Sequence, residues 1–112
     1  MTGPRNGDRF GERLRSVMER GDLTLGDLHH WFGRPRPTIR YWVHHGHGVY
    51  HLGGRSIEAL YSRLEQLEQV VDLAEKSGEP IVPEGMSARD RPSYIVRIRD
   101  EYARLSAAGA AA

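Results

Sequence analysis

The chain has 112 residues, enough for one modest domain or for a small domain with an appended helical segment. It contains no cysteine, so disulfide scaffolds, thiolate metal sites and thiol catalysis are excluded together. No apolar run approaches the length of a membrane span, and no signal peptide opens the chain. We therefore expect a cytoplasmic protein with no membrane partner.

The net charge of +1 conceals two halves of opposite sign. Residues 1–55 carry nine Lys or Arg and five Asp or Glu, whereas residues 56–112 carry seven and ten. No acidic residue lies between Asp27 and Glu58, although four arginines and all six histidines fall there. A basic, acid-free segment of this kind suits a polyanion, and DNA is the first candidate.

The spacing of apolar residues predicts an all-α fold. Residues 1–7 read as a disordered basic arm, after which Asp8 is expected to N-cap a helix over 8–20 that stops at Gly21. A second helix is predicted to begin at Thr24. The Thr24 hydroxyl can cap its free amides, with Asp27 three residues on as a short variant of the capping box.

Gly33 is expected to end this second helix, and Pro at a first turn lets a third helix start near Arg36 and run to about His45. Ile39, Trp42 and Val43 are predicted to face the core. Four polar or aromatic side chains are predicted to face outward: Arg36, Arg40, Tyr41 and His44. A loop follows over 46–54.

The fourth predicted helix, about 56–77, carries apolar residues at alternating spacings of three and four, typical of a short coiled-coil seam. The seam comprises Ile57, Leu60, Leu64, Leu67 and Val71. A Gly/Pro-rich linker and a fifth helix, about 93–107, complete a helical hairpin over 56–106, and 107–112 read as a frayed tail. We expect the hairpin to mediate oligomerisation, although the same seam would also suit packing on the chain's own core.

The second and third predicted helices have the layout of a helix-turn-helix, whose second helix enters the DNA major groove while the first braces it. Gly33 is the small residue at the bend. The segment resembles the prokaryotic helix-turn-helix pattern, with six positions in register: Leu28, Phe32, Gly33, Thr38, Ile39 and Trp42. The resemblance covers roughly residues 8–60, and it implies a three-helix DNA-binding bundle over about 8–50.

Residues 38–42 also resemble the mercury-resistance regulator class. The layout of one helix before the motif and helices after it is more similar to phage repressors and to phage terminase small subunits. Two positions depart from the pattern. His29 replaces the usual alanine, which implies looser packing or a histidine hydrogen-bonded where the helices cross, and Arg34-Pro35 replaces Val-Ser in the turn.

The resemblance implies a role for each exposed residue. Base edges would be contacted by Arg36, Arg40 and His44, with Arg40 the best candidate for a bidentate contact to guanine. Phosphates would be contacted by Thr24, Arg34 and Tyr41, and from the N-terminal arm by Arg5 and Arg9.

Two functions fit this layout. One is an oligomeric phage or bacterial transcriptional regulator that binds double-stranded DNA, nucleoid-associated in a bacterium. The other is a phage terminase small subunit that recognises viral DNA in the host cytoplasm and works with a packaging motor subunit. A protein-interaction adaptor is a third possibility. We expect no enzyme activity, no cofactor and no metal site, because no nucleophile–base pair, paired carboxylates or phosphate-binding loop is evident.

Overall fold

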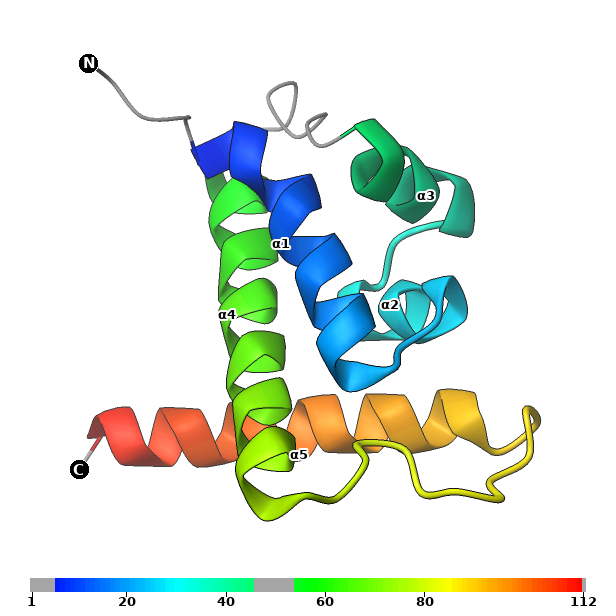
Figure 1. The fold of residues 1–112 in the computed structure, drawn as a ribbon. Helices are drawn as coiled ribbons and strands as arrows, with labels where there is room; N and C mark the ends of the chain where they lie inside the picture. The colour runs from blue at the N-terminus through cyan, green and yellow to red at the C-terminus, as the bar shows by residue number, and fades with distance from the viewer. Residues whose placement is uncertain (1–5, 46–53, 112) are drawn as a thin grey trace.

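The computed structural model describes residues 6–45 and 54–111, with side chains over 10–44 and 56–104. These residues form helices and turns and contain no strand, which confirms the all-α class. Figure 1 shows the arrangement of the five helices. They are α1 (Asn6–Gly21), α2 (Leu25–Phe32), α3 (Arg36–His45), α4 (Gly54–Ser77) and α5 (Arg91–Ala111).

The ends of α2 form as the sequence predicts. The Thr24 hydroxyl accepts a hydrogen bond from the Asp27 amide at 3.1 Å, and the Asp27 carboxylate accepts one from the Thr24 amide at 3.0 Å. This reciprocal pair is a capping box. Gly33 ends the helix in the left-handed conformation, with φ 66°, where an L side chain would be strained.

Two predicted boundaries were wrong, and one predicted boundary has a different cause. Helix α1 begins at Asn6, so Asp8 lies inside its first turn and does not N-cap it. Helix α1 ends at Gly21 as predicted, but the left-handed residue is the following Asp22, with φ 52°. A Cβ at position 21 would lie 2.9 Å from Ile81 Cδ1, so glycine leaves room for that buried side chain. At the other end of the chain, α5 continues to Ala111 through most of the predicted tail.

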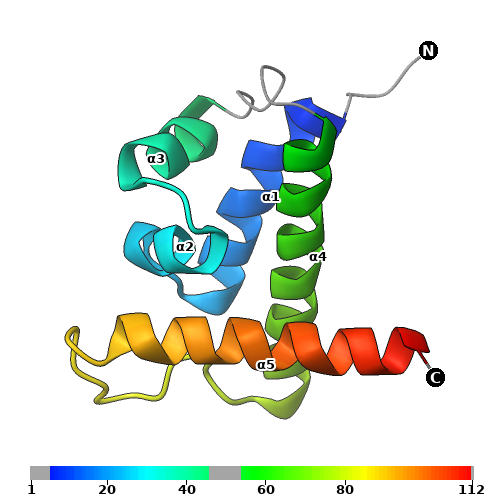
Figure 2. The ribbon, with the colours of Figure 1, turned by 180° about the vertical axis from the view of Figure 1, so that it is seen from behind.

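The apolar seam of α4 packs inside the same chain. Leu60, Leu64, Leu67 and Val71 are at most 3% exposed, and Ile57 is half-buried. Helix α1 covers this face, as Figures 1 and 2 show from opposite sides. Four of the five seam residues therefore lie in the core of one protomer, the alternative that the sequence left open, and their part in oligomerisation stays a prediction.

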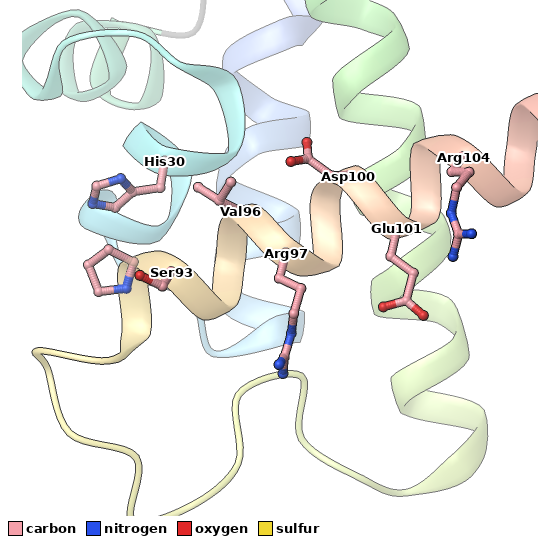
Figure 3. A pocket seen from close by; sticks show the side chains of 8 residues that line it. His30, Ser93, Val96, Arg97, Asp100, Glu101 and Arg104 are labelled. Atoms are coloured by element: carbon pink, nitrogen blue, oxygen red, sulfur yellow. The ribbon is translucent and has the colours of Figure 1, made fainter.

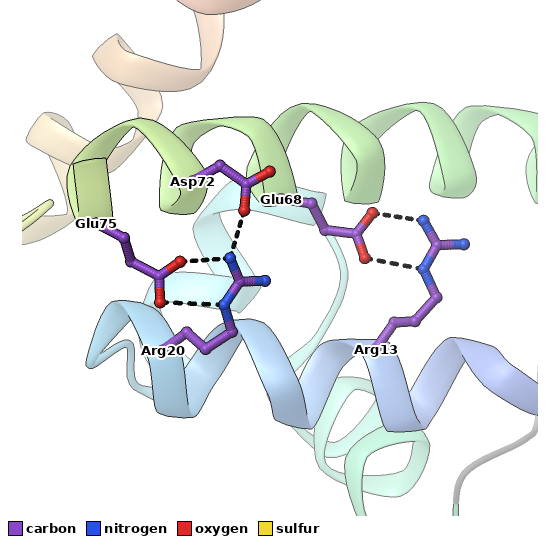
Figure 4. Close-up of polar contacts among 5 residues, drawn as sticks. All are labelled: Arg13, Arg20, Glu68, Asp72 and Glu75. Carbon is purple, nitrogen blue, oxygen red and sulfur yellow. Dashed lines mark hydrogen bonds and ion pairs between the residues drawn. The ribbon is translucent and has the colours of Figure 1, made fainter.

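Ion pairs border the α1–α4 contact on its outer side (Figure 4). The Arg13 guanidinium donates two hydrogen bonds to the Glu68 carboxylate, at 2.9 and 2.5 Å. One helical turn or more further along, Arg20 pairs with both Asp72 and Glu75. These groups are partly exposed, so they orient the two helices more than they stabilise them.

The ring of Phe10 lies at the centre of the core. Its centroid is 5.9 Å from that of Phe32, 5.4 Å from Trp42 and 5.2 Å from Tyr61, each in an edge-to-face arrangement. Since these three rings belong to α2, α3 and α4, one side chain of α1 joins all of them. The buried residues of both predicted regions, 8–50 and 56–106, form one continuous cluster.

Helix α5 crosses α4 and packs mainly along α2 (Figures 1 and 2). The two C-terminal helices therefore do not lie side by side as in the expected hairpin. The segment between them folds back onto the core, where Ile81 is buried and its carbonyl oxygen accepts a hydrogen bond from the Tyr94 hydroxyl at 3.0 Å. In the described ranges, no helix has the length and apolar character needed to cross a membrane.

Candidate nucleic-acid interface

Helix α3 presents opposite faces to the core and to solvent, as the sequence predicts. Ile39, Trp42 and Val43 are buried against the bundle. The outward residues are all exposed: Arg36, Arg40, Tyr41 and His44. Within the described part of the chain, neither Arg36 nor Arg40 forms an ion pair, so their charges are not cancelled by the protein's own carboxylates.

These outward residues meet the start of α2 in one open hollow of about 820 Å³. The hollow is lined by Thr24, Leu25, Gly26, Arg36, Pro37, Arg40, Tyr41 and His44. Five residues predicted to contact DNA are thus brought together, from two helices that are separate in sequence. None of the eight lining residues is acidic, so the surface favours an anionic ligand.

The Arg36 guanidinium lies over the first turn of α2. A Cβ added at Gly26 would be only 3.1 Å from an Arg36 terminal nitrogen, so the absence of a side chain at position 26 makes room for the guanidinium. The first amides of a helix have no partner within the helix. Here the Asp27 amide is capped by Thr24, whereas those of Leu25 and Gly26 have no acceptor among the described residues. A cation beside free amides favours phosphate.

His29 fixes the turn between α2 and α3. Its ring nitrogen Nδ1 donates a hydrogen bond to the carbonyl oxygen of Arg34, at 2.5 Å. Of the two consequences expected from a histidine at this position, the structure shows a hydrogen bond, but its acceptor lies in the turn between the helices. Arg34 itself is half-buried and does not line the hollow, although it was predicted to contact phosphate.

Other sequence predictions fall outside the described side chains. Arg5 lies wholly outside the described residues, and the side chain of Arg9 is likewise not described. Residues 46–53, most of the predicted loop, lie outside the described residues, and the side chains of His45, His47 and His51 are likewise not described. Contact of these residues with DNA therefore stays a prediction.

Asp27 forms an ion pair that the sequence analysis did not predict. It is the one buried charged residue among those described, at 3% exposure. Its two carboxylate oxygens accept hydrogen bonds from Arg91 at the start of α5, at 2.8 and 2.7 Å. Hydrogen bonding to Asp27 raises the pKa of Arg91. The partners are 64 positions apart, so no local pattern could reveal the pair.

A second open hollow, of about 850 Å³, lies where α5 passes α2 (Figure 3). His30 contributes from α2, and Arg97, Asp100, Glu101 and Arg104 contribute from α5. Desolvation lowers the pKa of His30, and the neighbouring His29 and Arg36 lower it further. Because this hollow mixes both signs of charge, it lacks the uniform character of the α3 face.

Comparison of the chain with protein-family models, curated proteins and solved structures finds no match. The function of the α3 face must therefore be inferred from its own geometry and chemistry.

Proposed function

We propose that this protein binds double-stranded DNA through a helix-turn-helix formed by α2 and α3. The observation that carries the proposal is the acid-free hollow that Arg36, Arg40 and His44 share with Leu25 and Gly26, whose amides have no acceptor among the described residues. The major groove is wide enough to admit an α-helix, and arginine and histidine side chains on the exposed face of α3 could form hydrogen bonds with the base edges there. The turn fixed by Gly33 and His29 supports it, since a reading helix must be held rigidly.

Within this proposal the exposed side chains have different roles. Arg40 and His44 lie further along α3 and are assigned to base edges. Arg36 was expected to read a base, but its guanidinium lies over the first turn of α2, a position that favours a phosphate. Thr24 and Tyr41 line the same hollow and are also assigned to the sugar–phosphate backbone.

For the biological role we propose a transcriptional regulator. A single helix-turn-helix reads only a few base pairs, so two copies on a palindromic site would raise affinity without new kinds of contact. The burial of the α4 seam removes one argument for a larger assembly through that helix. Native mass spectrometry with DNA tests this role: a dimer supports the regulator, and a ring of many subunits would instead support the terminase small subunit.

The DNA proposal is tested by selecting a preferred duplex from random sequences and measuring affinities of variants by fluorescence anisotropy. Arg40→Ala should weaken binding to the selected duplex by about 1–3 kcal/mol, with a smaller loss on random DNA. Arg104→Ala is the matched control, since Arg104 is exposed near the far end of α5 and should leave affinity unchanged. Both variants should melt close to the wild-type temperature.

Salt dependence separates DNA binding from docking on an acidic protein. Each neutralised phosphate releases counterions, so the logarithm of the binding constant should fall linearly and steeply with the logarithm of salt concentration. A wild-type protein that binds no duplex at low salt would overturn the proposal. An equal loss on selected and random DNA would restrict Arg40 to a phosphate contact.

A further inference from the structure

The start of α5 lies beside the proposed DNA-binding face. A hollow of about 330 Å³ separates them, and its lining includes Gly26 and Asp27 from α2, Arg36 from α3, and Met86 and Arg91 from the C-terminal part of the chain. It shares Thr24, Gly26 and Arg36 with the larger hollow on α3, so the two form one continuous surface. A DNA backbone that runs across α3 and the first turn of α2 would therefore also reach the start of α5.

Asp27 lines the smaller hollow and brings a negative charge to this surface. Its carboxylate caps α2 through the Thr24 amide and is almost wholly buried, so water and salt screen its charge weakly. An unpaired carboxylate here would repel a nearby phosphate and would oppose the attraction of Arg36. Asp27 caps α2, and DNA binding at this face requires that a nearby cation compensate its charge.

Arg91 supplies the compensating charge. Its guanidinium donates three hydrogen bonds. Two reach the Asp27 carboxylate, and the third, at 3.4 Å, reaches the carbonyl oxygen of Asp22. The Arg91 side chain keeps 28% of its surface exposed, on the side of the hollow. Because the charges of Asp27 and Arg91 cancel, the charge of Arg36 leaves this hollow with a net positive charge.

We infer that the start of α5 is part of the DNA-binding surface, where Arg91 cancels the charge of Asp27 and so allows a backbone phosphate to approach the first turn of α2. This inference rests on the proposed function and assigns Arg91 as a positioning residue. It extends the binding surface beyond the helix-turn-helix to the start of α5, where Arg91 lies 64 positions after Asp27 in the chain.

The test compares DNA affinities of charge variants, measured at low salt on selected and random duplexes. Arg91→Gln exposes the charge of Asp27 and should weaken binding to both duplexes about tenfold. The double variant Asp27→Asn/Arg91→Gln removes that charge, while an Asn oxygen can still cap α2. It should recover affinity to within about threefold of the wild type.

The single variant Asp27→Asn keeps the inference testable if Arg91→Gln does not fold. It leaves Arg91 unpaired and positive, so it should bind both duplexes about threefold more tightly than the wild type. Glu68→Gln and Arg13→Gln are the matched controls. They change the same charges in a bidentate pair on the α1–α4 contact and should leave affinity unchanged.

Several results would overturn the inference. One is a folded Arg91→Gln variant with wild-type affinity, another is a double variant as weak as Arg91→Gln, and a third is an Asp27→Asn variant no tighter than the Glu68→Gln control. Failure of the proposed function looks different, because the wild-type protein itself would then bind neither duplex and Arg40→Ala would have nothing to weaken.

Discussion

The indole of Trp31 donates a hydrogen bond from Nε1 to the carbonyl oxygen of Arg63, at 2.8 Å. The bond ties α2 to α4 across 32 positions of the chain. Trp31 is 2% exposed, so its polar N–H would otherwise be buried without a partner. Helix α2 is therefore fixed to α4 by a specific polar contact in addition to apolar packing.

Replacement of Trp31 tests this link. Trp31→Phe removes the hydrogen bond and part of the buried ring and should lower the free energy of unfolding by about 2–4 kcal/mol, measured by urea denaturation. Trp42→Phe is the control, because Trp42 is equally buried but makes no side-chain hydrogen bond within the described residues. A Trp42 variant that loses as much stability would show that ring volume alone accounts for the effect.

Gly33 tests the geometry of the turn. Gly33→Ala should destabilise the protein by about 1–2 kcal/mol, since the left-handed conformation strains an L residue. A Cβ at this position would meet nothing within 4 Å, so the whole loss should come from the backbone. Asn tolerates this conformation better, and thermal denaturation should therefore rank Gly33→Asn above Gly33→Ala. Equal melting temperatures for all three proteins would contradict the assigned turn.

Leu64 tests whether the α4 seam belongs to one protomer. Leu64→Ala creates a cavity at a fully buried position and should cost about 2–5 kcal/mol. Because the seam packs within the chain, the stability lost in Leu64→Ala should be the same at low and at high protein concentration. Leu73→Ala, at a site 55% exposed on the same helix, should change stability by less than about 0.5 kcal/mol. A Leu64→Ala variant that lowers the oligomeric state of the protein would assign the seam to an intermolecular interface.

The sequence predicts features whose causes are local. Thr24 and Asp27 cap α2 because a hydroxyl and a carboxylate three positions apart satisfy each other's backbone amides. Gly33 marks the end of α2 for the same kind of reason, and the alternation of buried and exposed residues on α3 follows helical periodicity. These features place the predicted base-contacting side chains on one face.

The course of α5 depends on contacts that no local pattern records. A seam of the α4 type indicates that an apolar face must be covered, but it does not say whether α1, α5 or a second protomer covers it. The pairs Asp27–Arg91 and Trp31–Arg63 link distant positions, and a carboxylate in a capping box gives no sign of its partner. The crossing of α4 and α5 therefore could not be predicted from the sequence.

His30 gives the protein a pH dependence of known sign. Desolvation and two neighbouring groups lower its pKa below the ordinary value of 6.5. As the pH falls below about 6.5, the unfolded chain binds a proton at this position before the folded chain does, so the free energy of unfolding decreases.

His30→Gln removes this contribution and leaves the other five histidines in place. Denaturant titrations between about pH 7.5 and about pH 5 should show a smaller loss of stability in the variant than in the wild type. Identical losses in the two proteins would contradict the lowered pKa. His44→Gln is the control, since His44 is exposed on α3.

The ring of Phe10 also limits how the protein can be dissected. It contacts aromatic rings on three other helices. A peptide that holds only α2 and α3 would lack the Phe10 ring that packs against both of them. Grafting the exposed α3 residues onto another scaffold would transfer their chemistry without this alignment. Any minimal version of the protein must therefore retain α1 and α4, although neither helix contributes a described side chain to the α3 hollow.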